Sequence, residues 1–383
     1  MPTVIDLFAG AGGLSLGASR AGFTVGAVVE IDSHAMETHK INFPNAIHIQ
    51  KDITTLTGDT ILQQAQLKRA DVIGVIGGPP CQGFSAIGQG NVEDSRNKLF
   101  VKFFEIVSDL QPAFFVAENV PGIMKKKYDN IRTEAFNKID NYIILPPVSI
   151  NASEYGAPTT RTRYFFIGYR DCEQIKPFSI ADIERKKVST ENRTTVEKAL
   201  EGLQADIRYT KTHKSCKATI PNYTLEKNHH QSDFFYYRVT DAIPENVGNV
   251  DYIRDYKTSH IVNGCIPTNH SPEVRARYAR LQYNEQDKIS KSKRLDPKGY
   301  CPTLRSGTGP EKGSYQAVRP IHYRYNRVIT PREAARLQGF PDWFKLPETI
   351  WHSFRQIGNS VSPIVAEQVL SAIFQKLTLR KLG

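Results

Sequence analysis

The side chain in this sequence best placed for nucleophilic chemistry is Cys81. It stands in the turn formed by residues 77–85 (GGPPCQGFS), directly after the apolar run 72–76. Two prolines fix the backbone ahead of the thiol and Gly83 loosens it afterwards, so the turn holds the thiol at a strand end. Most isolated cysteines are inert core residues, and that alternative applies equally to Cys172. At the ligand-binding edge of a sheet, a thiolate stabilised by a cation or a helix start can act as a nucleophile.

A carboxylate and two arginines also accompany apolar, strand-like runs. Glu118 ends the run 114–117 (FFVA), where a carboxylate partly removed from water suits a proton-donating role. The alternative is a surface Glu that caps the next segment. Arg161 and Arg163 open the strand-like run 163–169, and alternation along a strand sends both guanidinium groups to one side. Contact with phosphate or a base is the functional interpretation, and a solvated sheet edge is the structural one.

A glycine-rich segment, residues 6–17 (DLFAGAGGLSLG), runs from a strand through a turn into a helix. Glycines let the backbone approach a ligand closely, and the helix start offers free N–H groups. Ser15 occupies the third glycine position of a phosphate-binding GxGxxG pattern, and no GK[ST] follows, so neither dinucleotide nor P-loop signature is complete. Glu30 ends the next strand-like run, where it can accept bonds from ribose hydroxyls. The segment predicts a nucleoside cofactor, with a purely structural tight turn as the alternative.

The elements that must position these residues alternate along the first 170 residues. Strand-like runs at 3–8, 24–30, 72–76, 114–117 and 163–169 alternate with stretches of helical length and spacing at 14–21, 33–42 and 98–110. This alternation predicts an α/β domain with a largely parallel sheet. Its ligands are expected at the carboxyl ends of the strands, where the glycine-rich turns fall.

The regular alternation ends near residue 170. Residues 171–325 are rich in polar, basic and aromatic side chains with frequent turn signals, which favours a smaller, irregular, mostly β domain with long loops. Helix signals return at 331–338, and a closing helix begins at Ser362 as N-cap with a proline at the first helical position. The face formed by Val365, Val369, Ile373 and Leu377 is expected to pack onto the first domain.

Composition points to a polyanionic partner. The 383 residues include 50 Lys and Arg against 39 Asp and Glu, a formal net charge of +11. Residues 1–170 hold 16 basic and 16 acidic side chains, whereas residues 171–383 hold 34 basic and 23 acidic side chains. This one-sided excess favours nucleic acid or another anionic surface, although a basic surface that serves only solubility is the alternative.

The cysteines and the hydropathy pattern indicate the compartment. Five cysteines are scattered without a CxxC pair, which suggests neither a zinc site nor a disulfide framework and fits a reducing compartment. No apolar run approaches the roughly 20 residues of a membrane helix, and no basic leader precedes the first strand. We therefore expect a cytoplasmic protein without a membrane partner.

Taken together, these segments resemble the DNA (cytosine-5)-methyltransferase family, the S-adenosylmethionine-dependent enzymes of bacterial restriction-modification systems. The resemblance covers nearly the whole chain, in family order, and lies in the segments DLFAGAGG, VVEID, Asp52-Ile53, GGPPCQGFS, ENVPG, RTRYFFIG, RVITPREAARLQGFPDWF and QIGNSV. Any one of these motifs would be a weak signal, whereas eight in order are specific. The implied fold is an α/β, Rossmann-like methyltransferase domain with a smaller target-recognition domain.

The resemblance also implies roles for individual residues. Cys81 would be the nucleophile, Glu118 the group that engages N3 of the cytosine, and Arg161 and Arg163 the residues that hold the base and its surroundings. The family usually has Gln two residues before the first arginine, and this chain has Thr159, so no contact by that amide is carried over. The residues that would surround S-adenosylmethionine are Phe8, Gly10, Gly12, Gly13, Leu14, Glu30, Ile31, Asp52, Ile53, Pro80, Leu99, Asn359 and Ser360; no metal is implied.

The implied reaction is methylation of C5 of a flipped cytosine in a specific sequence of double-stranded DNA, through a covalent adduct of Cys81 at C6. An RNA cytosine-5 methyltransferase of the same fold is the nearest alternative. A nicotinamide-dependent oxidoreductase explains only the first 60 residues. A catalytically silent homologue would be expected to lack Cys81 or Glu118, and both are present.

The domain organisation follows from the same resemblance. We expect residues 1–174 to form the catalytic and cofactor-binding domain, completed by residues 351–383 at the C-terminal end. Residues 175–325 are expected to form the target-recognition domain, and residues 326–350 a connecting helical segment. A monomer is expected, with a cognate restriction endonuclease that acts on the same site as a candidate partner.

Overall fold

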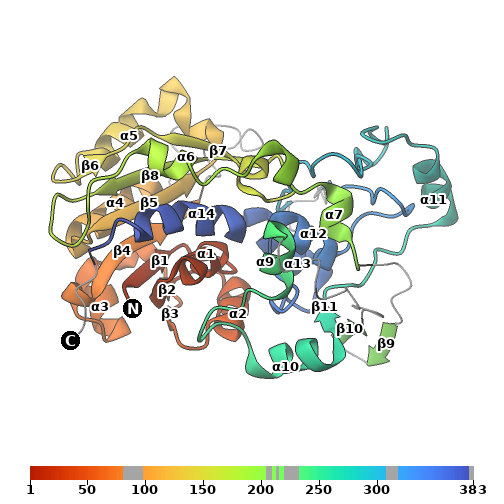
Figure 1. Cartoon of the computed structure of the whole chain (residues 1–383), viewed down its shortest axis with the longest axis horizontal. Coiled ribbons are helices and arrows are strands. Elements are labelled where there is room, and N and C mark those ends of the chain that lie inside the picture. The colour runs from red at the N-terminus through yellow and green to blue at the C-terminus, as the bar shows by residue number, and fades with distance from the viewer. Residues whose placement is uncertain (81–97, 204–208, 213–214, 220–232, 308–317, 379–383) are drawn as a thin grey trace.

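A computed structural model describes residues 1–80, 98–203, 209–212, 215–219, 233–307 and 318–378. Within these residues, an eight-stranded sheet forms the centre of the larger part of the molecule (Figure 1). Its strands are β1 (Thr3–Leu7), β2 (Thr24–Val29), β3 (Ile47–Ile49), β4 (Val72–Gly77), β5 (Phe114–Asn119), β6 (Ile143–Ile144), β7 (Val148–Asn151) and β8 (Thr162–Tyr169).

The strand order places the two glycine-containing turns side by side. The order is β3-β2-β1-β4-β5-β8-β6, with β7 also paired to β8. Strands β1 to β5 pair in parallel, whereas β8 is antiparallel to β5. The chain moves outward to β2 and β3 on one side of β1 and to β4 and β5 on the other. A crevice therefore opens between the carboxyl ends of β1 and β4, the usual ligand position in such sheets.

Helices cover both faces of the sheet. One face packs against α1 (Gly13–Ala21), α2 (Ser33–Asn42) and α14 (Pro363–Phe374), and the other against α3 (Gly58–Ala65), α4 (Lys98–Leu110) and α5 (Asp129–Phe136). Neighbouring residues of a strand enter opposite cores: Phe114 joins the α1 side and Phe115 the α4 side. Both faces of the central strands are therefore apolar, as expected for a sheet covered by helices on both sides.

The predicted α/β domain is confirmed, and the expected strands and helices agree with the structure to within two residues at each end. The helix at 98–110 and the helix at 331–338, α12 (Pro331–Gln338), have the predicted bounds. The sequence analysis missed β3, α3 and α5. Strand β3 has only three residues, and α5 has a weak apolar stripe, so neither presents a clear periodic signal.

The region after β8 is irregular, as predicted, but its described part is not mostly β. It contains the helices α6 (Ile180–Glu184), α7 (Val196–Leu200), α9 (Phe234–Thr240), α10 (Val250–Ser259) and α11 (Pro272–Ala279), and one antiparallel sheet of β9 (Tyr209–Thr212), β10 (Ser215–Thr219) and β11 (Ile261–Asn263). Side-chain caps start several of these helices, including Asn249 at α10 and Ser271 at α11. Such short, capped helices with few apolar residues give little periodicity in the sequence.

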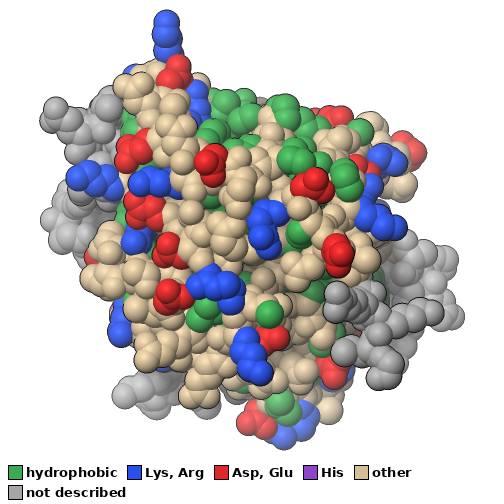
Figure 2. Space-filling model, turned by 90° about the vertical axis from the view of Figure 1, so that its left-hand side faces the viewer, with side chains coloured by type: hydrophobic (Ala, Val, Ile, Leu, Met, Phe, Trp, Pro, Cys, Tyr) green, Lys and Arg blue, Asp and Glu red, His purple; other side chains and the backbone are tan. Residues whose placement is uncertain are grey.

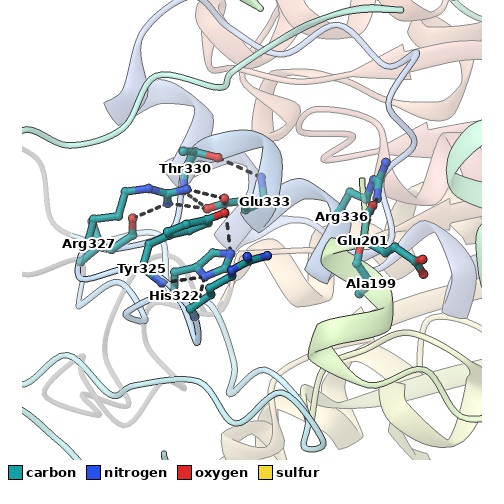
Figure 3. A network of polar contacts seen from close by, with 10 residues as sticks. Ala199, Glu201, His322, Tyr325, Arg327, Thr330, Glu333 and Arg336 are labelled. Atoms are coloured by element: carbon teal, nitrogen blue, oxygen red, sulfur yellow. Dashed lines mark hydrogen bonds and ion pairs between the residues drawn. The ribbon is translucent and has the colours of Figure 1, made fainter. Parts of the chain in front are cut away.

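Helix α12 anchors this irregular region through buried polar contacts (Figure 3). Arg327 donates to both carboxylate oxygens of Glu333 at 2.8 and 2.7 Å, and Glu333 also accepts from the backbone N–H of Thr330 at 2.7 Å. Arg336, fully buried, donates to the carbonyls of Ala199 and Glu201 at 3.2 and 2.6 Å. These contacts join the end of α7 to α12, which itself precedes α13 (Ile350–Asn359).

The closing helix returns to the first domain, as predicted. Its N-cap is Ser362, and Val365, Val369 and Ile373 are buried in the core shared with α1. A Cβ at Gly17 of α1 would lie 2.3 Å from the Cβ of Ala366, so the two helices approach closely at this point. Leu377 follows the helix and pairs with Ile175 through an isolated β-bridge.

The charges on the surface agree with the uneven distribution along the chain. Figure 2 shows the end of the molecule formed by the large sheet, where basic and acidic side chains lie interspersed around an apolar area. The irregular region lies at the opposite end, around α11 (Figure 1). Among the described helices, none is both long and apolar enough to cross a membrane.

Candidate functional site

The glycine-rich turn after β1 forms the floor of a cavity of about 530 Å³ at the carboxyl ends of the central strands. Phe8 and Gly10 both adopt left-handed backbone conformations, with φ of 61° and 56°. This conformation is rare for an aromatic residue and marks local strain of the kind found at ligand-binding turns. A Cβ at Gly10 would meet no atom within 4 Å, so the backbone there faces open space.

Glu30 clamps this turn to the next one. One carboxylate oxygen accepts from the backbone N–H of Gly10 and the other from that of Asp32, each at 2.8 Å. Burial raises the pKa of Glu30, and the two backbone N–H donors partly oppose that rise. A carboxylate offers about four lone-pair positions. Glu30 can therefore keep both backbone contacts and still accept bonds from the two hydroxyls of a ribose.

The turn after β3 forms a second wall. Asp52 is the N-cap of a 3-10 helix (Ile53–Thr55), and its carboxylate accepts from the backbone N–H and the hydroxyl of Thr54 at 2.9 and 2.8 Å. Ile53 is buried, whereas Ile31 is 64% exposed although it lines the cavity. An apolar side chain left open beside Glu30 suits the planar face of a nucleobase.

The C-terminal segment closes the cavity from the other side. Asn359 and Ser360 follow α13 and line the cavity. The Ser360 hydroxyl donates to the carbonyl of Gln356 at 2.7 Å. A Cβ at Gly13 would lie 2.3 Å from the carbonyl oxygen of Val361. The glycine turn and the C-terminal segment, about 350 residues apart in sequence, are thus in direct backbone contact.

A second group of polar residues lines the cavity at the ends of β4, β5 and β8. Glu118 forms an ion pair with Arg163, with Nε and Oε1 2.8 Å apart, and both side chains are largely buried. Arg161 is 3% exposed and donates to the carbonyl of Leu304 at 3.3 Å. Asn119 donates to the carbonyl of Pro79 at 3.3 Å, which ties the turn after β5 to the turn that leads to position 81. The two arginines line one cavity, as strand alternation predicts.

Most of the predicted site residues meet in this one cavity. Those that line it are Phe8, Gly10, Gly13, Leu14, Glu30, Ile31, Asp52, Ile53, Pro80, Leu99, Glu118, Arg161, Arg163, Asn359 and Ser360. Gly12 does not line it, because its α-carbon faces α2, where a Cβ would lie 2.4 Å from the ring of Phe43. Cys81 lies outside the described residues, directly after Pro80.

The sequence analysis missed a polar rim on α13. Arg355 forms an ion pair with Asp32 at 2.9 Å, and the rings of His352 and His34 lie 3.8 Å apart. Gln356 donates to the carbonyl of His34 at 3.0 Å. These residues lie within two turns of Asn359, and helical spacing places 352, 355, 356 and 359 on neighbouring positions of one face. That spacing was the available signal.

The cavity suits a nucleoside cofactor rather than a metal. It has the size of a small-molecule site and an apolar lining with a few polar groups. No group of three potential metal ligands lies together in the described residues. An open glycine turn, a buried ribose-binding carboxylate and an exposed apolar side chain fit the adenosyl group, and the polar groups near Glu118 lie at the other end of the same cavity.

Comparisons with known proteins agree on one family. Residues 2–375 match the model of the family described as C-5 cytosine-specific DNA methylase. The chain is 35% identical to the type II methyltransferase M.XorII of Xanthomonas oryzae pv. oryzae, over 98% of this chain and 85% of that protein. It is 31% identical to the type II methyltransferase M.DdeI of Desulfomicrobium norvegicum, over 97% and 88% of the two chains.

Solved structures agree with the fold. A DNA modification methyltransferase encoded within an E. coli prophage superposes with a TM-score of 0.85 at 48% identity, over 98% of this chain and 99% of that one. The Dnmt2 methyltransferase of S. pombe superposes with a TM-score of 0.60 at 16% identity, over 97% and 98% of the chains, which shows a shared fold.

Proposed function

We propose, from the premise that the chain belongs to the C-5 cytosine-specific DNA methylase family, that it methylates a flipped cytosine in a specific duplex sequence through a covalent Cys81 adduct. The observation that carries this proposal is the single cavity. It joins a nucleoside-binding end at Glu30 to a polar end at Glu118, beside the turn that continues into Cys81. S-Adenosylmethionine would occupy the first end and the target base the second.

The chemistry accounts for the residue types. C5 of cytosine is a poor nucleophile, so the Cys81 thiolate first adds to C6, while N3 receives a proton or a strong hydrogen bond from Glu118. S-Adenosylmethionine supplies an electrophilic methyl group that C5 can then attack. Loss of the C5 proton to a base and departure of the thiolate from C6 restore the aromatic ring and release 5-methylcytosine.

Arg163 would act as a positioning residue in this reaction. Its Nε lies 2.8 Å from Oε1 of Glu118, which fixes one oxygen and leaves Oε2 to face the base. A Cβ at Gly78 would lie 3.3 Å from Oε2, so a side chain at this position would crowd that oxygen. Arg161 bridges the catalytic end of the cavity to Leu304, in the region before α12. It would place the base relative to the second domain.

The cytosine can reach this cavity only when it leaves the duplex, because stacking in DNA covers both faces of C6. We propose duplex DNA as the substrate and residues 175–325 as the target-recognition domain. Residues 1–174 and 351–383 would form the catalytic domain, and residues 326–350 would connect the two. The contacts of α14 with α1 and of Val361 with Gly13 support the return of the C-terminal segment. The excess of basic residues after position 170 supports phosphate contacts by the second domain.

Two further parts of the proposal concern the cell. Restriction-modification relatives suggest a cognate endonuclease that acts on the same DNA sequence. We propose a monomer that works in the cytoplasm, where S-adenosylmethionine and DNA are both present.

The test is adduct formation on modified DNA. In 5-fluorocytosine the C5 proton is replaced by fluorine, so the enzyme cannot eliminate and should remain attached to the DNA. Wild-type protein with S-adenosylmethionine should yield a denaturation-resistant complex and Cys81→Ser should not. Cys172→Ser, a free and half-buried cysteine outside the cavity, is the matched control and should behave as wild type. A Cys81→Ser variant that still methylates DNA would refute the assignment, and turnover on RNA but not on DNA would favour the alternative substrate.

A further inference from the structure

A continuous chain of side-chain hydrogen bonds lies beneath the glycine-rich turn. It begins at Asp6 of β1, whose Oδ2 lies 2.6 Å from the hydroxyl of Ser15 on α1. That hydroxyl lies 3.0 Å from Nε2 of His39 on α2, and Nδ1 of His39 lies 3.0 Å from Nε2 of His48 on β3. Four elements that surround the cofactor end of the cavity are thus joined by three consecutive contacts.

The chain connects a buried carboxylate to the protein surface. Asp6, Ser15 and His39 are fully buried, whereas His48 is half-buried. The second oxygen of Asp6, Oδ1, has no hydrogen-bond partner among the described residues. His48 is therefore the member of the chain that can exchange a proton with water directly.

The chain satisfies its members in two opposite directions. With Asp6 ionised, Ser15 donates to Asp6, His39 donates through Nε2 to Ser15, and His48 donates through Nε2 to His39. When a proton enters at Nδ1 of His48, each bond reverses. His48 then passes its Nε2 proton to Nδ1 of His39, His39 passes its Nε2 proton to Ser15, and Ser15 passes its proton to Asp6. One solvent proton is gained, Asp6 becomes neutral, and both imidazoles stay neutral in the Nδ1–H tautomer.

We propose that Asp6, Ser15, His39 and His48 form a proton wire that lets the charge of Asp6 follow the pH of the solvent and thereby sets the strength of cofactor binding. Asp6 is a positioning residue here, because it acts on the cavity through Glu30 and the glycine turn. This inference rests on the proposed role of the cavity as the S-adenosylmethionine pocket.

The electrostatics place this switch in a useful range. Burial raises the pKa of Asp6 to about 7, opposed by the hydrogen bond from Ser15 and reinforced by the charge of Glu30. Burial also holds the pKa of His39 well below its usual value, and burial with the nearby charge of Lys40 lowers that of His48. The carboxylate therefore takes the proton while the imidazoles relay it. Glu30 and Lys40 are the charged groups that act on the wire among the described residues.

The wire also contacts the turn mechanically. A Cβ at Gly12 would lie 3.0 Å from Cδ2 of His39, so the imidazole packs directly against the turn. S-Adenosylmethionine carries a positive sulfonium, whereas S-adenosylhomocysteine does not. An ionised Asp6 adds negative charge below the pocket, so affinity for the charged cofactor should rise as the pH rises through the Asp6 pKa, and affinity for the uncharged product should rise much less.

The direct test is the tautomeric state of the histidines in the wild-type protein. Nitrogen-15 spectra of histidine-labelled protein should show His39 and His48 as Nδ1–H tautomers below about pH 6 and as Nε2–H tautomers above about pH 8. Both should stay neutral at His39 throughout. A single tautomer at all pH values, or a cationic His39, would overturn the proposal without any need for a variant.

Calorimetry provides the link to the cofactor. Between pH 6 and pH 8, wild-type affinity for S-adenosylmethionine should rise by roughly tenfold, a size common for coupled sites. Asp6→Asn should remove this step. Ser15→Ala should move it to higher pH, because the ionised carboxylate loses its donor, and should abolish the tautomer switch. Ser19→Ala, which removes a neighbouring hydroxyl of α1 that bonds only the Ser15 carbonyl, should match wild type. Binding without any pH step would refute the wire, whereas no binding of the cofactor at any pH would refute the proposed function instead.

Discussion

Substitution of Glu30 by Gln tests the cofactor end of the cavity more sharply than its removal. Both oxygens of Glu30 accept backbone N–H groups at 2.8 Å, one from Gly10 and one from Asp32. A Gln side chain has the same shape but offers one oxygen and one NH₂ group. Whichever way the amide turns, its NH₂ group faces a backbone donor. The substitution must therefore break one side of the clamp.

The cost can be worked out from these contacts. A hydrogen bond to a charged group contributes about 1.5–3 kcal/mol, and an unpaired buried donor costs about 1–3 kcal/mol. We expect Glu30→Gln to lower the free energy of unfolding by about 2 kcal/mol and to weaken S-adenosylmethionine binding by roughly 10- to 100-fold. Glu30→Ala opens space for water at both donors. Its effect on stability should therefore be smaller than twice that of the Gln variant.

The measurements are urea denaturation and calorimetric titration with S-adenosylmethionine at pH 7.5, with Glu37→Gln as the matched control. Glu37 is an exposed carboxylate on α2 and should tolerate the change. Because burial raises the pKa of Glu30, wild-type affinity should fall on acidification at a pH above the usual range for Glu. This acid limb should be absent in Glu30→Gln. Wild-type affinity in the Gln variant would refute the clamp.

The remaining predictions concern catalysis, packing and specificity. Glu118→Gln should lower single-turnover methylation by about 10²-fold or more and leave calorimetric cofactor affinity nearly unchanged; equal losses in both would argue against a role at the base. Gly17→Ala should lower the urea midpoint by an amount equivalent to about 1–3 kcal/mol, because its Cβ would lie 2.3 Å from that of Ala366, whereas Gly10→Ala meets no neighbour and should change stability only through its positive φ. Exchange of residues 185–300 for those of a relative should transfer the relative's target sequence in bisulfite sequencing, and an active chimera that keeps the original target would place recognition in the catalytic domain.

The catalytic half of the chain was predictable because its signals are local. Each cavity residue from the first domain stands at the end of an apolar strand or in the turn that follows it, and parallel strands bring such ends to one edge. The Asn359 and Ser360 positions came from the family resemblance rather than from any periodicity. Their place beside the glycine turn depends on the long return of the chain through α12, α13 and α14.

The polar contacts that act between distant segments were not predictable. Asp6 reads as an ordinary strand residue and His39 as a residue of a weakly amphipathic helix. Only the fold shows that both are buried and joined through Ser15, which the sequence analysis treated as a missing glycine. The helices of the irregular region were missed for a related reason. Their stability comes from caps and from buried arginines such as Arg332 and Arg336, which contact partners far away in sequence.

Ser15 links the two features that distinguish this glycine turn. A glycine at this position would leave Asp6 with no side-chain donor and His39 with no acceptor at Nε2, and both groups are fully buried. An unpaired buried polar group is costly, so the three side chains must be present together or replaced together. The departure from a dinucleotide-binding pattern is therefore explained by what lies under the turn rather than by the ligand above it. Cofactor class and proton linkage then follow from the same residue.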